Sequence, residues 1–261
     1  MISESADPEF STSGLRIDPT TILTYYRSDM TLGRSVWEAL LLIIRGDAAV
    51  WQITAVSLQV SVTALIAAAV VGVPLGYVLG NGRNAVAGFF SWLLYTLAAI
   101  PTVAIGLLFY FVFSASGPLG WTELLYTRAV MAFAQFTLAL PILTAIALSS
   151  TRRLPNELRE TAIVLGMGPL RRMWVLLWEL RLAVISALLI AFARVFTELG
   201  AAIIVGGNIR GRTRTLTTVI ALEHSKGDDA RAIALGVVLV VIALAVSGLV
   251  HGLTERARSS R

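Results

Sequence analysis

The chain has 261 residues, of which 56% are hydrophobic and only 14% charged, whereas an ordinary soluble domain has roughly 45–50% apolar and about 25% charged residues. This composition excludes a compact soluble fold and also a disordered chain. With no cysteine and only two histidines, His224 and His251, disulfides and thiolate chemistry are excluded and no metal site is expected. The net charge of +5 comes almost wholly from arginine, which we interpret as contacts with lipid headgroups and cytoplasmic partners, not with nucleic acid.

The amino-terminal part is predicted to lie outside the membrane. Residues 1–35 form a polar leader without hydrophobic periodicity, and the run Asp7-Pro8-Glu9-Phe10 resembles a cloning scar, so part of this leader is expected to derive from a vector. The apolar run in 36–44 is too short to cross a bilayer and is flanked by charges. Residues 36–50 are therefore predicted to form an interfacial helix.

Five apolar segments are long enough to cross the hydrocarbon core, which takes about 20 residues in a helix. The predicted transmembrane domain covers residues 51–250. Its spans are predicted at 53–79, 89–114, 129–150, 182–205 and 232–250. Pro74, Pro101 and Pro141 lie within or at the ends of spans and predict kinks inside a helical bundle. The predicted fold class is an all-α membrane protein with five transmembrane helices.

Arginine density predicts the orientation of this bundle. If the loop 152–181 and the tail 251–261 are cytoplasmic, their side of the membrane carries basic residues at about twice the density of the other. Five spans place the two termini on opposite sides. We therefore expect a multi-pass protein of the cell membrane with its amino terminus outside and its carboxyl terminus in the cytoplasm.

The loop 152–181 has the pattern of a helix, a glycine break and a second helix. Pro155 is suited to a helix start, and Gly166 and Gly168 are suited to a helix end. Such a segment would form a rigid protrusion below the membrane. A plain interfacial connector is the alternative interpretation.

The first helix of this loop resembles the EAA motif of ABC importer permeases, because Gly166 follows the Glu160-Thr161-Ala162 run at the motif's spacing. Thr161 stands where the motif usually has alanine, and the proline of its later part is absent. The resemblance implies a type I ABC importer-like bundle, with a cytoplasmic coupling helix that docks on a separate ATPase. The implied docking candidates are Arg159, Glu160, Thr161, Ala162 and Gly166.

ATP itself is expected on another polypeptide. A phosphate-binding loop needs a lysine in a Gly-Lys-Ser/Thr context, and the single lysine of the chain, Lys226, lies between Ser225 and Gly227. The chain is therefore expected to have no cofactor of its own, with ATP and Mg²⁺ bound by the partner ATPase.

Two charges lie inside the fourth predicted span. Arg194 and Glu198 are four residues apart and share a helix face. Charges at membrane depth are costly unless they are paired or face a water-filled cavity. Two interpretations stay open: a structural ion pair, or a gate in the translocation path. The further gate candidates are Gly200, Gly206 and Gly207.

The stretch after this span is rich in arginine. Arg210, Arg212 and Arg214 alternate with glycine and threonine after Asn208. The planar fork of arginine matches oxyanions, and a basic entrance raises the local anion concentration. These four residues are candidates for an outer mouth that attracts an anion or contacts a binding protein. Anchoring by snorkelling arginines is the alternative.

Residues 197–228, TELGAAIIVGGNIRGRTRTLTTVIALEHSKGD, resemble the matching stretch of molybdate/tungstate-type permeases, most closely the tungstate-specific branch. The resemblance extends over about residues 36–250. It implies a homodimeric permease with two ATP-binding cassette subunits and an extracytoplasmic oxyanion-binding protein. The expected function is therefore ATP-driven import of tungstate or molybdate, in which this chain is the translocation subunit and not an enzyme.

Two other functions were compared with this one. An ion-driven secondary transporter or channel for a small anion would need several intramembrane carboxylates or histidines as a relay, and only Glu198 qualifies. An intramembrane enzyme would need a catalytic cluster at membrane depth, which the predicted spans lack. The secondary transporter or channel is the alternative function.

Overall fold

The computed structural model describes residues 37, 41, 48–82 and 85–259, and within these ranges it contains helices and no strand. The helices are α3 (Ala48–Asn81), α4 (Ala85–Ala98), α5 (Thr102–Phe113), α6 (Arg128–Arg152), α7 (Asn156–Val164), α8 (Pro169–Glu179), α9 (Arg181–Phe196), α10 (Gly200–Gly206), α11 (Leu216–Ser225) and α12 (Asp229–Ser259), with a short 3-10 helix η1 (Gly120–Thr122). The predicted all-α fold class is confirmed. The predicted leader 1–35 and most of the interfacial helix 36–50 lie outside the described residues.

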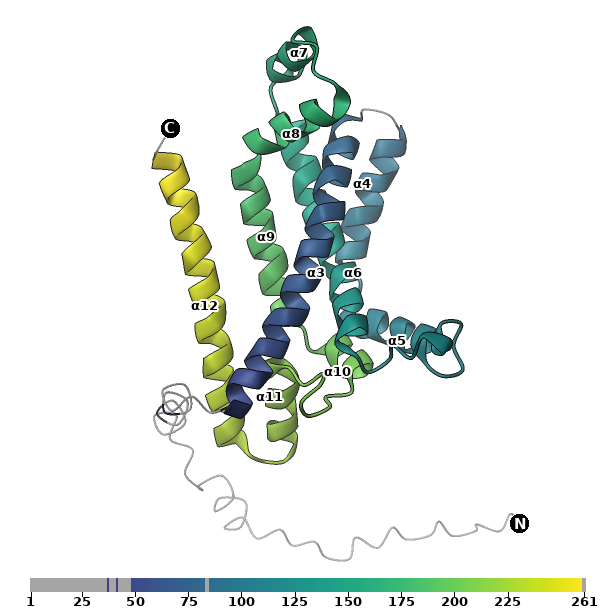
Figure 1. Ribbon diagram of the computed structural model, residues 1–261, viewed down its shortest axis with the longest axis vertical. Helices are drawn as coiled ribbons and strands as arrows, with labels where there is room; N and C mark the ends of the chain where they lie inside the picture. The colour runs from purple at the N-terminus through teal and green to yellow at the C-terminus, as the bar shows by residue number, and fades with distance from the viewer. Residues whose placement is uncertain (1–36, 38–40, 42–47, 83–84, 260–261) are drawn as a thin grey trace, which may run out of the picture.

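Helices α3, α4, α6, α9 and α12 run along the long axis of the molecule (Figure 1). One end carries α7 and the carboxyl end of α12, and we call it the α7 end. The other end carries α10, α11 and the start of α3, and we call it the α11 end. Three helices in the described ranges, α3, α6 and α12, are long and apolar enough to cross a membrane, and two bent helix pairs bring the total to at most five.

Three of the predicted spans lie inside single helices. Residues 53–79 lie within α3, 129–150 within α6 and 232–250 within α12. The predicted tail 251–261 is not a separate segment, because α12 continues as a helix to Ser259.

The predicted span 89–114 is wrong as a single helix. Its two parts, α4 and α5, meet at a bend of 95°. Pro101 stands at the break, with φ −59° and ψ 127°. A helix tends to end here because proline has no N–H to donate and moves the preceding residue out of the helical region. As a result α5 runs across the bundle (Figure 1) and packs on α10, where a Cβ on Gly106 would lie 2.9 Å from Cα of Ala201.

The predicted span 182–205 also divides into two helices, α9 and α10. The hydroxyl of Thr197 donates to the carbonyl of Ala193 (2.8 Å) at the end of α9. The carboxylate of Glu198 accepts from the N–H of Ala201 (3.0 Å) in the first turn of α10. The chain breaks here because an acceptor side chain satisfies an N–H at the start of a new helix.

Glycines let α3 and α6 pack closely along the middle of the bundle. Gly72, Gly76 and Gly80 follow one another at four-residue spacing on α3 and are buried. A Cβ on Gly76 would lie 2.5 Å from the backbone oxygen of Thr144, and one on Gly80 would lie 2.6 Å from Cβ of Thr151. Small residues at this spacing allow membrane helices to approach each other closely. The sequence analysis missed this pattern, although the spacing can be read directly.

We expect Gly76→Ala to lower the free energy of unfolding by about 1–3 kcal/mol, because the new methyl group must push apart two helix backbones. Gly88→Ala on α4 is the matched control, since a Cβ there meets nothing within 4 Å. The control should leave stability unchanged or raise it by up to about 1 kcal/mol through helix propensity. Thermal unfolding in detergent, followed by size-exclusion chromatography, measures both. Equal midpoints would contradict the tight α3–α6 contact.

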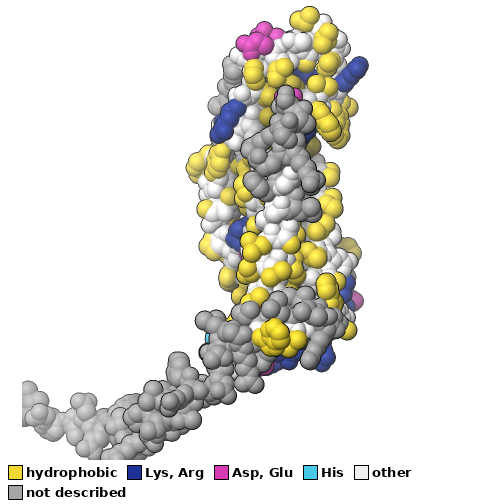
Figure 2. All heavy atoms as spheres, turned by 90° about the vertical axis from the view of Figure 1, so that its left-hand side faces the viewer, with side chains coloured by type: hydrophobic (Ala, Val, Ile, Leu, Met, Phe, Trp, Pro, Cys, Tyr) yellow, Lys and Arg dark blue, Asp and Glu magenta, His cyan; other side chains and the backbone are white. Residues whose placement is uncertain are grey.

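The outer faces of the long helices are apolar and exposed. Large hydrophobic side chains project from α3, α4 and α12 along their length. They include Val62, Ile66, Val70, Phe89, Trp92, Tyr95, Val240, Val241 and Leu244. On the face shown in Figure 2, most charged side chains lie toward the two ends, with hydrophobic side chains between them. A bilayer is the medium that such a surface requires, because soluble proteins rarely expose apolar patches of this extent.

Candidate functional site

The elbow, which we define as residues 153–180, projects from the bundle and confirms the predicted helix, glycine break and second helix (Figure 1). Gly166 has φ 67°. Its N–H donates to the carbonyl of Ile163 (2.9 Å), and the N–H of Met167 donates to that of Ala162 (3.1 Å). This pair of bonds is the Schellman motif that ends a helix at a left-handed glycine. Gly166 therefore sets the direction in which the chain leaves α7.

Two contacts fasten the elbow to the bundle. The guanidinium of Arg159 donates to the carbonyl of Thr151 near the end of α6. Leu176 of α8 packs with Leu154 and with Tyr77 of α3 in a small buried cluster. A force on α7 or α8 therefore reaches both α3 and α6, the pair that packs most closely.

The predicted docking residues of the elbow have different surroundings. Glu160 and Thr161 are exposed, Arg159 is half-buried and Ala162 is buried. The most exposed apolar group of α7 was not predicted. It is the tip, which we define as Ile163, Val164 and Leu165, with 57%, 85% and 65% of their surfaces exposed. Three apolar residues before a helix-ending glycine were the available signal in the sequence. An exposed apolar group of this kind is typical of a surface that contacts another protein or a membrane.

Arg194 and Glu198 form an ion pair at the end of α9, with 2.8 Å between Nη1 and Oε2. The Glu198 side chain is 3% exposed, against 41% for Arg194. The backbone oxygen of Glu198 also accepts from the hydroxyl of Thr217 on α11 (3.0 Å). Together with the cap on α10, these bonds join three helices. Of the two interpretations left open by the sequence, this geometry supports the structural ion pair.

The three glycines predicted as gate candidates each have a local role. A Cβ on Gly200 would lie 2.9 Å from Cγ2 of Val103, and one on Gly206 would lie 2.8 Å from Sδ of Met131. Gly207 has φ 65°, where a side chain is strained. Gly200 and Gly206 therefore allow close packing, and Gly207 allows a turn.

The 207–215 loop, which joins α10 to α11, is held by its own hydrogen bonds. Thr213 is 1% exposed, and its hydroxyl accepts from the N–H of Ile209 (3.0 Å). Thr215 and Thr218 form a capping box at the start of α11. The sequence predicted these threonines as part of the outer mouth, together with the arginines. Thr213, Thr215 and Thr218 are buried, and their hydroxyl groups form hydrogen bonds within the loop and the first turn of α11.

The four polar candidates of the outer mouth divide by environment. Arg210 and Arg212 are exposed, while Arg214 is half-buried and Asn208 has a left-handed φ of 49°. The amide of Asn208 donates to the carbonyl of Thr218 (3.3 Å). The loop therefore presents its arginines from a fixed backbone at the α11 end.

Arg128 at the start of α6 was missed by the sequence analysis. Its guanidinium donates to Oε1 of Gln59 on α3 (2.7 Å) and to the carbonyls of Arg212 (2.7 Å) and Gly211 (3.3 Å). One side chain thus ties the 207–215 loop to α3 and α6. An arginine at the start of a helix gives no sequence signal for such a role, because its partners lie 69 to 84 residues away.

Similarity to known proteins agrees with this arrangement. Residues 72–259 match the family described as the binding-protein-dependent transport system inner membrane component. The tungstate uptake system permease protein TupB of Peptoclostridium acidaminophilum is 37% identical over 217 residues, which cover 83% of this chain and 95% of that protein. A probable anion ABC transporter permease protein of Haloferax volcanii is 38% identical over 206 residues, 76% of this chain and 87% of that protein.

A third relative is the TupB protein of Campylobacter jejuni, 39% identical over 165 residues, which cover 63% of this chain and 69% of that protein. The relatives are permeases, which are translocation components and not enzymes. The family match covers the elbow, the α9–α10 break and the 207–215 loop. This chain therefore belongs to the inner membrane components of binding-protein-dependent transport systems, and it is a multi-pass permease of the cell membrane.

Proposed function

We propose that this permease carries tungstate, or the closely similar molybdate, into the cell as part of an ATP-driven importer. The names of the two TupB relatives support tungstate, and the name of the Haloferax volcanii relative supports an anion. The observation that carries the ATP-driven mechanism is the exposed apolar tip. It projects from an elbow fastened to α3 and α6, as a docking element for a motor subunit must be.

The proposed assembly contains two copies of this chain, two ATP-binding cassette subunits and an oxyanion-binding protein. The elbow would face the cytoplasm and the α11 end would face outward, where the binding protein delivers the ion. In this orientation the start of α3 would lie outside and the end of α12 inside, because the two lie at opposite ends of the bundle (Figure 1). ATP and Mg²⁺ would be bound by the ATPase, and this chain would hold no cofactor.

The coupling step follows from the contacts of the elbow. The tip would lie in a groove of the ATPase, with Glu160 and Thr161 exposed beside it. Closure of the two ATPase subunits would move the elbows, and Arg159 and Leu176 would pass the movement to α6 and α3. The bundle would then change between outward-open and inward-open packings, a shift between two discrete arrangements. Arg194 and Glu198 would keep α9, α10 and α11 together during this movement.

Transport in proteoliposomes tests the proposal. We expect the complete complex, with ATP enclosed and the binding protein and tungstate outside, to accumulate tungstate only when ATP can be hydrolysed. We expect this chain alone to accumulate none when a proton or sodium gradient is the only energy source. Gradient-driven uptake by the chain alone would falsify the ATP-driven mechanism and support the ion-driven alternative.

A further inference from the structure

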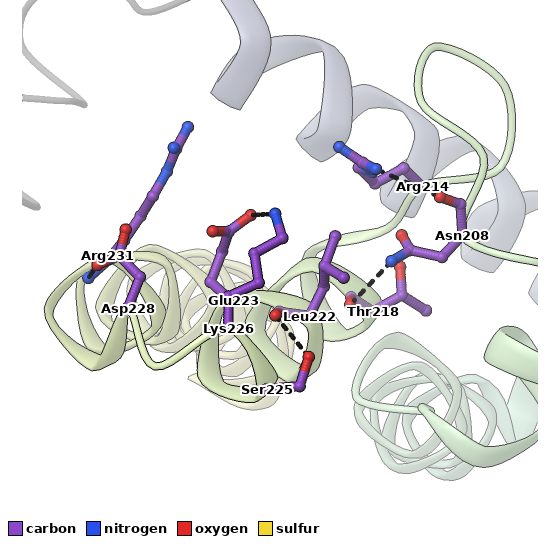
Figure 3. A network of polar contacts seen from close by, with 9 residues as sticks. All are labelled: Asn208, Arg214, Thr218, Leu222, Glu223, Ser225, Lys226, Asp228 and Arg231. Carbon is purple, nitrogen blue, oxygen red and sulfur yellow. Dashed lines mark hydrogen bonds and ion pairs between the residues drawn. The ribbon is translucent and has the colours of Figure 1, made fainter.

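A pocket of about 260 Å³ lies at the α11 end of the bundle. Three segments that are far apart in the sequence line it: the start of α3, the 207–215 loop, and α11 with the first residues of α12. Its polar and charged lining residues are Gln52, Arg210, Arg214, Glu223, Lys226 and Arg231. Figure 3 shows Glu223, Lys226 and Arg231 extending to the same side of the α11–α12 turn, with Arg214 approaching from the loop.

The pocket has an excess of positive charge. Glu223 is 8% exposed and bonds to Nζ of Lys226 (3.0 Å), so these two charges offset each other. Arg210, Arg214 and Arg231 have no acidic partner among the residues that the structure describes. In addition, Nε of Arg214 is buried without a hydrogen-bond partner in the described part of the chain. Three guanidinium groups around one small pocket, without an acidic partner in the described ranges, favour an anion as the ligand.

Hydrogen bonds hold the backbone segments that form the lining. The buried hydroxyl of Thr213 and the bonds from Arg128 hold the loop that carries Arg210 and Arg214. The N–H of Leu216 donates to Oγ of Ser57 (2.9 Å), which fixes α11 against α3. A site whose backbone is held in place before binding loses less entropy when the ligand arrives.

We propose that this pocket binds a tetrahedral oxyanion with two negative charges, and that the permease itself holds the transported ion at its entrance. Because a water molecule takes about 30 Å³ of liquid, the volume admits such an ion together with some of its hydration water. Guanidinium groups from two segments give paired N–H donors that match the oxygens of the anion. The identity of the ion as tungstate rests on the proposed function, whereas the preference for an oxyanion rests on the pocket.

The site adds residues that the sequence did not single out for binding. Lys226 and Arg231 come from the α11–α12 turn, and Gln52 comes from α3. Of the arginines predicted at the outer mouth, only Arg210 and Arg214 line the pocket; Arg212 lies on the same loop and does not. An ion bound here would bridge all three segments and stabilise the folded α11 end by mass action.

Equilibrium dialysis of the permease–ATPase complex in nanodiscs, without the binding protein, tests the site with tungstate and sulfate as probes. We expect one tungstate per permease chain. Arg210→Gln and Arg231→Gln should each weaken binding at least about tenfold, the loss of one charge-assisted hydrogen bond. Arg212→Gln makes the same charge change outside the pocket and should retain binding. Because Arg210 and Arg231 are exposed, their variants should fold normally, and equal thermal midpoints check this.

The outcomes separate the site from the proposed function. If the complex transports tungstate with the binding protein but binds none without it, the site is wrong and the function stands. If the complex binds tungstate but no ATP-driven uptake occurs, the proposed function is wrong and the site stands. Equal weakening by all three variants, or loss of binding at physiological chloride, would overturn the site in favour of general surface attraction. If Arg210→Gln or Arg231→Gln weakens the docking of the binding protein but leaves the binding of tungstate unchanged, the site is also overturned.

Discussion

Arg194→Leu is expected to lower the free energy of unfolding by about 3–5 kcal/mol, the cost of leaving a buried charge without its partner. The Glu198 side chain is 3% exposed, and its carboxylate would lose the 2.8 Å bond from the guanidinium in this variant. Removing the other charge, by Glu198→Gln, should lower the free energy of unfolding by less. Arg194 is 41% exposed, and in Glu198→Gln the side-chain oxygen can still accept from the N–H of Ala201, which caps α10.

A double variant makes the test specific. Adding Glu198→Gln to Arg194→Leu removes the uncompensated charge and should recover most of the lost stability. The measurement is a double-mutant cycle on denaturation in mixed micelles, followed by circular dichroism. In ATP-driven uptake, Glu198→Gln should remain active once it is folded. A stable Glu198→Gln complex that hydrolyses ATP but does not transport would instead make the pair a gate.

Val164→Asp should abolish ATP-driven uptake and release the ATPase from the complex. Val164 is the most exposed residue of the tip, at 85%, and a carboxylate placed there would have to lose its water on docking without gaining a partner. Loss of a central apolar contact in an interface weakens binding by about 2 kcal/mol or more, roughly thirtyfold. Co-purification of the ATPase on size-exclusion chromatography and uptake in proteoliposomes measure the two effects. Val164→Leu keeps the apolar contact and should keep both.

Two glycines of the elbow provide a test variant and a matched control for the hypothesis that the elbow couples the ATPase to transport. Gly166 has φ 67°, and a β-branched residue is strongly disfavoured there. Gly168 has φ −60° and ψ 159°, a conformation that any residue before a proline accepts. A Cβ meets nothing within 4 Å at either position. Gly166→Val should therefore redirect the tip and impair uptake, while Gly168→Val should not. If Gly166→Val and Gly168→Val show equal uptake, and Val164→Asp binds the ATPase normally, the elbow has no role in coupling.

Composition and spacing alone were enough for the class of the protein and for the position of its elbow. Apolar runs long enough to cross a bilayer specify membrane helices because the hydrocarbon core leaves few other structures possible. Glycine near a helix end and proline at a helix start act on the backbone within a few residues. For this reason the pattern over 152–181 could be predicted without knowledge of its partners.

Tertiary structure decided where two of the predicted spans break. The α4–α5 bend of 95° needed more than Pro101, because Pro74 and Pro141 lie inside helices that continue through them. After Pro101, by contrast, α5 turns away from the direction of α4 and contacts α10 at Gly106. Likewise, Glu198 ends one helix and starts another because its acceptor oxygens meet Arg194 and the first turn of α10. The spacing of a charged residue in an apolar run does not predict such a helix break, because it does not show which groups the side chain will meet.

The basic pocket depended most on the fold. Arg210, Arg212 and Arg214 could be read together as candidates for attracting an anion, because alternating arginines are visible in the sequence. In the pocket, Gln52, Lys226 and Arg231 join Arg210 and Arg214 from segments that only the packing of α3 against α11 brings together. Local patterns identify the residues that act within one turn or helix. A binding site assembled from distant segments exists only once hydrogen bonds and packing have fixed the distances between them.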